Sequence, residues 1–217
     1  MKLPHFLAPG IIAAALVSCD NPADRTATAT VGDPATPSGD ATTDSRWNLS
    51  DESTLKFVGS KFNGSSHDGG FKDITAYILV NGEDTVTGGS VDIDMNSTWS
   101  DNDKLTKHLK TVDFFDVENH PTTSFVLTDV TKNDDGNYSV SGNLKMRGVE
   151  KNITFPATAS RNGDKITVAA GFDINRKQWG INYTGAAGAL KEALIRDEVV
   201  LDMKLTFVPE NTGSEVQ

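Results

Sequence analysis

The sequence predicts an all-β domain in which eight antiparallel strands close into a barrel, accompanied by two short helices. Apolar and polar residues alternate in eight segments, which is the period of a strand with one buried face. Turn-forming sequences such as NGED, NDDG and RNGD separate many of these segments. One apolar face per strand is typical of an antiparallel sheet, and closure into a barrel leaves that sheet without exposed edges. A sandwich of two sheets satisfies the same pattern.

The predicted strands follow one another along most of the chain. The first is short, with Leu55 and Phe57 on either side of Lys56, whereas the last keeps its alternation from Val199 to Phe207. Successive side chains of a strand point to opposite faces, so each segment presents one apolar face to a common core. The alternating residues lie in segments 55–57, 74–80, 91–95, 125–127, 138–146, 153–157, 166–174 and 199–207.

Two segments have helical spacing instead. The sequence SDNDKLTKHLK starts with Ser100 as a capping residue, has acids in its first turn, and places Leu105 and Leu109 one helical turn apart. The sequence AAGALKEALIRDE, from Ala186, repeats this spacing with two further leucines. Both helices are short, so we expect them to cap the ends of the barrel or to shape its mouth.

The N-terminus has the features of an export signal. Residues 1–18 combine Lys2 with the apolar run IIAAALV, which is too short to span a bilayer and is typical of a signal peptide. The sequence LVSC, which ends at Cys19, resembles the lipobox of bacterial lipoproteins, where the cysteine carries the lipid. The resemblance implies an anchor of more than one acyl chain, enough for stable membrane attachment. Cys19 is the only cysteine, so an intramolecular disulfide is excluded.

These features divide the chain into four parts. Residues 1–18 are the predicted signal peptide, and residues 19–46 are the lipidated cysteine and a disordered tether with few large apolar side chains. Residues 47–209 are the barrel domain, and residues 210–217 are a flexible tail. We therefore expect a lipid-anchored protein of the bacterial cell envelope, facing the periplasm or the cell surface. Neither the membrane that holds the anchor nor the oligomeric state is indicated by the sequence.

The charge and the ionisable residues exclude some classes of function. The formal net charge of -10 argues against nucleic acid as a partner, because its binding depends on cationic side chains. It also argues against a basic membrane-binding face, so attachment falls to the lipid at Cys19. His67, His108 and His120 lie in separate motifs without a metal-binding spacing. The sequence predicts no catalytic residues, no metal and no enzymatic activity.

Five motifs together are similar to the YceI-like family. They are FVGSKFNGSSHDGGF, KHLKTVDFFDVENHPTTSF, YSVSGNLKMRGVEKNITFPA, FDINRKQWGI and RDEVVLDMKL, and they cover nearly all of residues 50–208. The resemblance implies a lipocalin-like barrel of eight strands with an elongated apolar interior that holds polyisoprenoid lipids, such as an isoprenoid quinone. It requires no other cofactor.

The apolar faces of the strands supply the candidate ligand contacts. On the pattern alone these side chains fill a solid core, as in small barrels without a ligand, whereas the resemblance implies a cavity. Trp179 and Tyr183 each combine a large ring with a polar group and are candidates to line or gate it. The predicted lumen residues are Phe57, Ile78, Met95, Phe114, Phe125, Met146, Phe155, Phe172, Trp179, Tyr183 and Met203.

The sequence LKTVDFFDVENHPTTSF, residues 109–125, is interpreted as the junction between a helix and the next strand. In an extended backbone Phe114 and Phe115 point in opposite directions, so one can line the lumen while the other packs under the helix. Pro121 disfavours helix at the preceding residue and begins the next strand. A weaker set of polar residues is predicted to meet a lipid head group at the rim of the barrel: Lys61, His67, Arg147 and Arg196.

Two functional hypotheses follow. The first is non-enzymatic binding or carriage of an isoprenoid or other long-chain lipid inside the barrel. A lipid chain is already out of water in the bilayer, so a barrel gains little net energy by binding it, which suits reversible exchange. The alternative is an envelope stress or interaction module with a filled barrel and no ligand.

Overall fold

The computed structural model describes residues 21–37, 44–186, 190 and 194–210. The helical elements are η1 (Pro22–Arg25), η2 (Met95–Ser97), α1 (Asp103–Leu109) and η3 (Arg176–Trp179). The strands are β1 (Ala27–Thr28), β2 (Thr30–Gly32), β3 (Ser45–Leu49), β4 (Thr54–Lys61), β5 (Ser66–Phe71), β6 (Ile74–Val80), β7 (Val86–Asp94), β8 (Thr98–Ser100), β9 (Thr122–Lys132), β10 (Tyr138–Met146), β11 (Val149–Asn162), β12 (Lys165–Asn175) and β13 (Ile195–Pro209). No helix among the described residues is long and apolar enough to cross a membrane.

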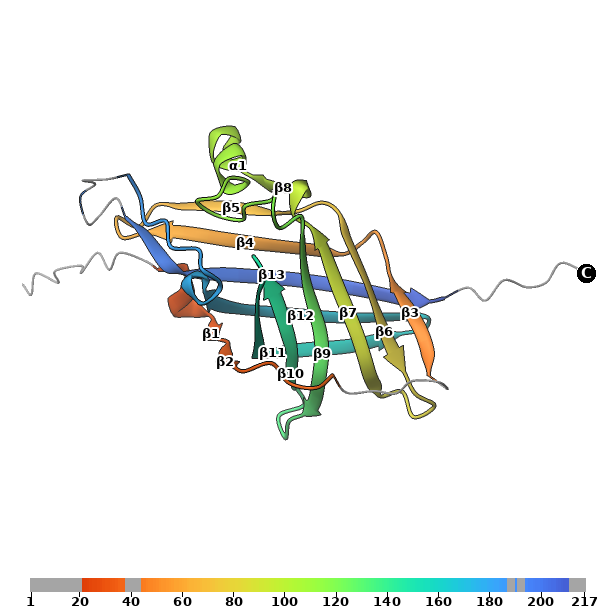
Figure 1. Cartoon of the computed structure of the whole chain (residues 1–217). Helices are drawn as coiled ribbons and strands as arrows, with labels where there is room; N and C mark the ends of the chain where they lie inside the picture. Colours follow the sequence, from red (N-terminus) through yellow and green to blue (C-terminus); the bar gives the residue numbers. More distant parts are fainter. Residues whose placement is uncertain (1–20, 38–43, 187–189, 191–193, 211–217) are drawn as a thin grey trace, which may run out of the picture.

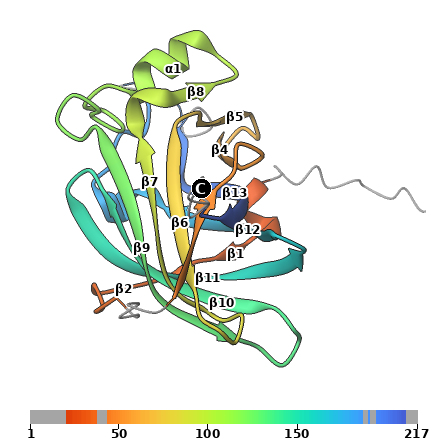
Figure 2. The same cartoon turned by 90° about the vertical axis from the view of Figure 1, so that its right-hand side faces the viewer.

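Eight strands form a closed antiparallel ring in the order β12-β11-β10-β9-β7-β6-β3-β13. The pairing of β12 with β13 closes the ring, and every neighbouring pair in it is antiparallel. Figures 1 and 2 show the long strands β12 and β13 crossed by β6, β7 and β9, with α1 and β8 together at one end. The predicted eight-stranded barrel is confirmed.

The ring differs from the prediction at one strand. The chain runs along one edge of β13 in two pieces, with β3 opposite Phe207 to Pro209 and β4 opposite Ile195 to Lys204. β3 then pairs with β6 and belongs to the ring, whereas β4 pairs with β5, which in turn pairs with β8. The segment 55–57, predicted as a strand of the ring, therefore lies in this side branch of the sheet, and the ring position belongs to the strand that contains Trp47.

The core follows the predicted alternation. Buried side chains recur every second residue along β12, for example at Ala170, Phe172 and Ile174. They form a larger cluster with Phe155 and Trp179, while a smaller cluster surrounds Trp47. The core therefore consists of two apolar groups along the length of one barrel.

Of the two predicted helices, the first is present, and the described residues of the second are not helical. α1 begins after Asn102, whose side-chain oxygen accepts hydrogen bonds from the amides of Lys104 and Leu105. Asn102, and not Ser100, is therefore the cap. The second predicted helix, residues 186–198, includes residues 187–189 and 191–193, which lie outside the described residues. Its last four residues begin β13, because they pair as a strand with β4 and β12.

The expected disordered tether is wrong for residues 21–37. This segment contains η1, β1 and β2, and it lies against the outside of the barrel. Ala29 is buried there, and Val31 packs against the larger core cluster. Its few apolar side chains could not fold alone, but the barrel supplies both strand partners and a surface to bury them. Cys19 and the signal peptide lie outside the described residues.

Candidate functional site

The barrel encloses a cavity of about 1030 Å³. Its wall combines inward side chains from both halves of the ring with residues of α1 and of the turn after it. Most of these side chains are aliphatic or aromatic, as expected for a site that removes an apolar ligand from water. The predicted open lumen is therefore present, and a filled barrel is not observed.

Groups of aromatic rings shape the wall. In one group, Phe57, Phe71 and Phe115 have ring centroids 5.7 to 6.4 Å apart. The ring of Phe57 lies across Gly69, where a Cβ atom would be 2.2 Å from the Phe57 Cζ atom. Gly142 makes the same room beneath Phe125, with a corresponding distance of 2.1 Å. The missing side chains of these glycines therefore decide how far the rings lie from the wall.

The adjacent Phe114 and Phe115 of segment 109–125 both contribute to the cavity wall. The segment turns between α1 and β9 rather than running extended, so Phe114 and Phe115 do not point to opposite faces. Phe114 contacts the rings of His108 and Tyr183, with centroids 5.0 and 5.2 Å away. The segment is the predicted junction, and it also closes the cavity next to α1.

The structure places most of the predicted site residues in the wall. Ten of the eleven predicted lumen residues line the cavity, and their contact with a ligand stays a prediction. Trp179 does not line it: its indole is fully buried, and Nε1 donates a hydrogen bond to the Leu144 carbonyl at 3.1 Å. The turn formed by η3 directs this ring between β10 and the core, where it packs and does not gate.

Of the four residues predicted for the polar rim, two line the cavity and two do not. Lys61 and His67 line the cavity near α1, whereas Arg147 and Arg196 do not. Arg147 donates from Nη1 to the Phe114 carbonyl at 2.6 Å and so holds the turn that carries Phe114. The guanidinium of Arg196 lies 4.5 Å from the ring centroid of Phe62. These two arginines stabilise loops around the cavity without forming its wall.

Charged side chains lie at both ends of the cavity. At the end near α1, the wall contains Lys61 and His67, and at the opposite end it contains Lys132, Arg161 and Asp84. Arg161 and Asp84 form an ion pair across that opposite end. Asp84 is the one carboxylate among the described residues of the wall, although the chain as a whole is strongly acidic. The cavity is thus apolar along its length and polar, with an excess of positive charge, at its ends.

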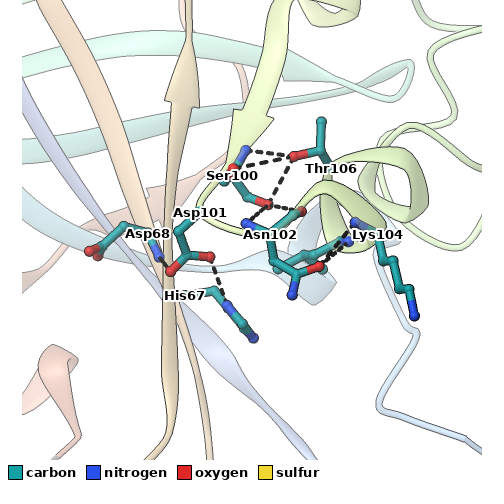
Figure 3. Close-up of polar contacts among 8 residues, drawn as sticks. His67, Asp68, Ser100, Asp101, Asn102, Lys104 and Thr106 are labelled. Carbon is teal, nitrogen blue, oxygen red and sulfur yellow. Dashed lines mark hydrogen bonds and ion pairs between the residues drawn. The ribbon is translucent and has the colours of Figure 1, made fainter.

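Hydrogen bonds between β5, β8 and α1 hold His67 in place (Figure 3). His67 Nδ1 lies 2.8 Å from Asp101 Oδ1, and the Asp68 amide donates to Asp101 Oδ2 at 3.2 Å. Desolvation is the largest influence on the pKa of Asp101 and raises it, but these hydrogen bonds together lower the pKa below its ordinary value. Ser100 and Thr106 link β8 to α1 beside this pair.

A buried arginine that the sequence analysis did not single out braces the same end of the barrel. Arg176 donates from Nη1 to the Ile181 carbonyl at 2.5 Å and from Nε to the Arg196 carbonyl at 3.1 Å. Burial lowers the pKa of its guanidinium, while Asp197, 3.7 Å from Nη2, opposes that shift. Arg176 therefore joins η3, the following loop and the start of β13. The motif FDINRKQWGI contains it, but no local pattern distinguishes it from an exposed arginine.

The histidines are distributed over three separate places. No group of three metal-ligating side chains occurs among the described residues. His67, His108 and His120 each lie next to a different carboxylate, at 2.8, 2.8 and 3.9 Å: Asp101, Asp113 and Asp116, respectively. These three histidines therefore do not converge on one site.

A family model described as the YceI-like domain matches residues 47–207. The chain belongs to the YceI-like family. Solved structures with this fold support the same conclusion about architecture. Burkholderia cenocepacia BcnA aligns with a TM-score of 0.62 at 21% identity, over 71% of this chain and 96% of its own. A polyisoprenoid binding domain from Saccharophagus degradans aligns with a TM-score of 0.61 at 16% identity, over 77% and 100%. These likenesses establish the lipocalin-like fold of this YceI-like protein.

Curated relatives match over shorter stretches. A UPF0312 protein of Pseudomonas putida is 35% identical over 103 residues, which cover 45% of this chain and 54% of the relative. A UPF0312 protein of Yersinia pestis is 36% identical over 88 residues, which cover 40% and 45%. The matched part of the chain thus spans about half the length of these relatives.

Proposed function

We propose that this YceI-like protein binds an isoprenoid or other long-chain lipid inside its barrel, as a carrier or reservoir at the bacterial cell envelope rather than as an enzyme. The observation that carries the proposal is the apolar cavity of about 1030 Å³. The family supports it, since a domain of the same fold is described as polyisoprenoid-binding. The open cavity argues against the alternative, a filled barrel without a ligand.

The energetics of binding favour exchange over storage. Each buried CH₂ group gains roughly 0.8 kcal/mol relative to water, so a chain of several isoprene units strongly prefers the cavity to solution. The same chain gains a similar amount in a bilayer, so the net difference between membrane and cavity is small. A protein of this kind therefore takes up a lipid and returns it, with the polar ends of the cavity receiving the head group.

The proposed location depends on the N-terminus. A lipid on Cys19 would hold the barrel beside a membrane that can load it, facing the periplasm or the cell surface. Incorporation of labelled palmitate by the wild type, and its loss in Cys19→Ser, tests this part of the proposal. Equal labelling of both proteins would contradict it.

Native mass spectrometry tests the binding. The full chain carrying Cys19→Ser is exported by a bacterial host, purified without detergent and incubated with menaquinone-4. We expect an added mass that is released on activation and identified as an isoprenoid. In this background Phe155→Trp enlarges a ring in the cavity wall and reduces the bound fraction. Val112→Trp is the matched control, because Val112 is 67% exposed. A bare polypeptide mass in the unblocked protein, under all loading conditions, would overturn the proposal.

A further inference from the structure

The wall of the barrel is interrupted between β11 and β12. The two strands pair from Asn162↔Lys165 to Thr158↔Ala169, and among the described residues their direct pairing stops there. Beyond that point β11 continues along β10 and β12 continues along β13. The two strands therefore diverge and leave a split in the ring.

The residues at the split are those of a strand edge. Pro156 of β11 has no amide hydrogen to donate, and Gly171 of β12 has no side chain to pack against a neighbour. A cavity of about 340 Å³ opens on the outside here, lined by Pro156, Thr158, Ala169 and Gly171 among others. The two strands themselves therefore do not close the gap, and the residue types at their edges are suited to a strand edge.

Residues 21–37, which we name the N-terminal strap, fill the rest of the split. Within the strap, β1 pairs in parallel with β12 at Phe172 and Asp173, and β2 pairs with β11 from Asn152 to Thr154. Ala29 lies between β1 and β2, is 5% exposed, and belongs to the core cluster. The strap therefore completes the ring from outside, with one short strand on each edge.

Polar side chains hold the strap more than apolar burial does. The hydroxyls of Thr26 and Thr28 donate to Asp173 Oδ2 at 3.0 and 3.2 Å. The side chain of Asn143 makes two hydrogen bonds to the backbone of Ala35, at 2.7 and 3.0 Å. A segment with two short strands and few buried apolar groups opens at a lower free energy than a continuous ladder.

Only side chains separate the strap from the cavity. Phe155 of β11 and Phe172 of β12 stack across the split, with centroids 4.1 Å apart and planes at 8°. Both rings line the cavity, as do Ile153 and Ile174 on either side of them. The inner part of a path between β11 and β12 would thus be apolar, whereas both ends of the barrel carry charged side chains.

We propose that the N-terminal strap is the movable cover of a lateral portal between β11 and β12, through which the apolar ligand enters and leaves the cavity. The inference rests on the proposed lipid binding. Opening needs release of the hydrogen bonds to Asp173 and Asn143 and rotation of the stacked rings of Phe155 and Phe172. The ladder from Thr158 to Asn162 stays intact and acts as the hinge side of the split. The strap directly follows the predicted anchor in sequence, so the portal faces the source of lipid.

A disulfide across the strap tests the portal. Thr30 and Thr154 are register partners, and β-pair partners lie within disulfide distance, so Thr30→Cys/Thr154→Cys staples the strap to β11. The control staple, Lys145→Cys/Glu150→Cys, joins register partners on β10 and β11 where the ladder is continuous. Both are made in the full chain with Cys19→Ser. Quenching of tryptophan fluorescence by menaquinone-4 supplied in phosphatidylcholine vesicles reports uptake, and transfer back to empty vesicles reports release.

We expect the oxidised strap staple to slow uptake and release at least about tenfold with little change in Kd, because a closed cover blocks the path without altering the cavity. Reduction with dithiothreitol restores both rates, and the control staple changes neither. Equal rates for the oxidised and reduced strap staple would overturn the portal while leaving the binding function intact.

Hydrogen exchange of the unliganded protein tests the cover without any ligand. The Ala29 amide, which donates to the Asp173 carbonyl at 2.9 Å, should exchange at least about tenfold faster than amides of the β10–β11 ladder. Exchange of this amide as slow as that of the ladder would overturn the portal. This outcome does not depend on whether menaquinone-4 binds, so the portal and the proposed function are tested separately.

Discussion

The two halves of β11 meet the next strand in different ways. Its last five residues, Thr158 to Asn162, pair directly with β12 across a tight turn. Among the described residues, its earlier part around Ile153 has no direct backbone pairing with β12, and the N-terminal strap pairs with both strands there. The first contact is a ladder formed by chain neighbours, and the second depends on segments 145 residues apart, as in the bond from Thr28 to Asp173. The comparison shows that one ring combines a seam of direct strand pairing with a seam bridged by a separate segment of the chain.

The physical difference lies in what holds each seam. A β-ladder satisfies successive backbone groups and buries the alternate side chains between them. The strap instead inserts two short strands and relies on side-chain hydrogen bonds to Asp173 and Asn143. One Asp173 oxygen, Oδ1, is buried without a hydrogen-bond partner among the described residues, which costs free energy in the docked state. We therefore expect the strap to be bound less firmly than the strands that it joins.

The largest effect is expected at Trp179, which ties the two sides of the split together. Its ring follows β12 in the chain and donates to the Leu144 carbonyl of β10. We expect Trp179→Ala to lower the free energy of unfolding by about 3–5 kcal/mol, because it removes a fully buried indole. Trp179→Phe should lower the free energy of unfolding much less, because it keeps a large aromatic ring at this position. Urea unfolding followed by circular dichroism measures both, and near-wild-type stability of the alanine variant would show that the split does not need this brace.

Two glycines, one in the continuous wall and one at the split, allow the two regions to be compared. We expect alanine to lower the free energy of unfolding at the first and to raise it at the second. A Cβ atom at Gly89 of β7 would lie 2.7 Å from the Tyr77 carbonyl oxygen, so Gly89→Ala forces two backbones apart. We expect a loss of about 1–3 kcal/mol. At Gly171 no atom lies within 4 Å, so Gly171→Ala should stabilise by about 0.4–1 kcal/mol through the unfolded chain. The same urea experiment compares them, and equal losses at both sites would show that the split is as tightly packed as the ladder.

The smallest effect on stability is expected at the end of the barrel near α1, away from the split. The pKa of Asp101 is lowered in the folded protein from its ordinary value of 3.8, so its contacts with His67 and Asp68 stabilise the fold above that pH. As pH falls through the lowered pKa, the carboxylate is protonated and the stabilisation is lost. We therefore expect Asp101→Asn to melt slightly below wild type at pH 6 and to match it in strong acid. A melting difference that does not depend on pH would contradict this assignment.

Much of the cavity could be predicted from sequence because strand alternation is local. The inward positions of Phe125, Met146 and Phe172 follow from their neighbours alone, since side chains alternate across a strand whatever it pairs with. The same reasoning missed β5 and Phe71, because SHDGGF has no alternation to detect. It also assigned the strap to a disordered tether, because the residues that pair with it lie far along the chain.

The sequence by itself determined that this is a domain of alternating antiparallel strands, which faces of the strands are apolar, and that its motifs resemble those of YceI-like proteins. Those features depend on the order of neighbouring residues. Only the tertiary structure decided that Trp179 packs outside the cavity, that β3 replaces β4 in the ring, and that the N-terminal strap fills a split in the wall. These outcomes depend on which distant segments meet, and the burial of Asp173 under Thr26 and Thr28 exists only once they have done so.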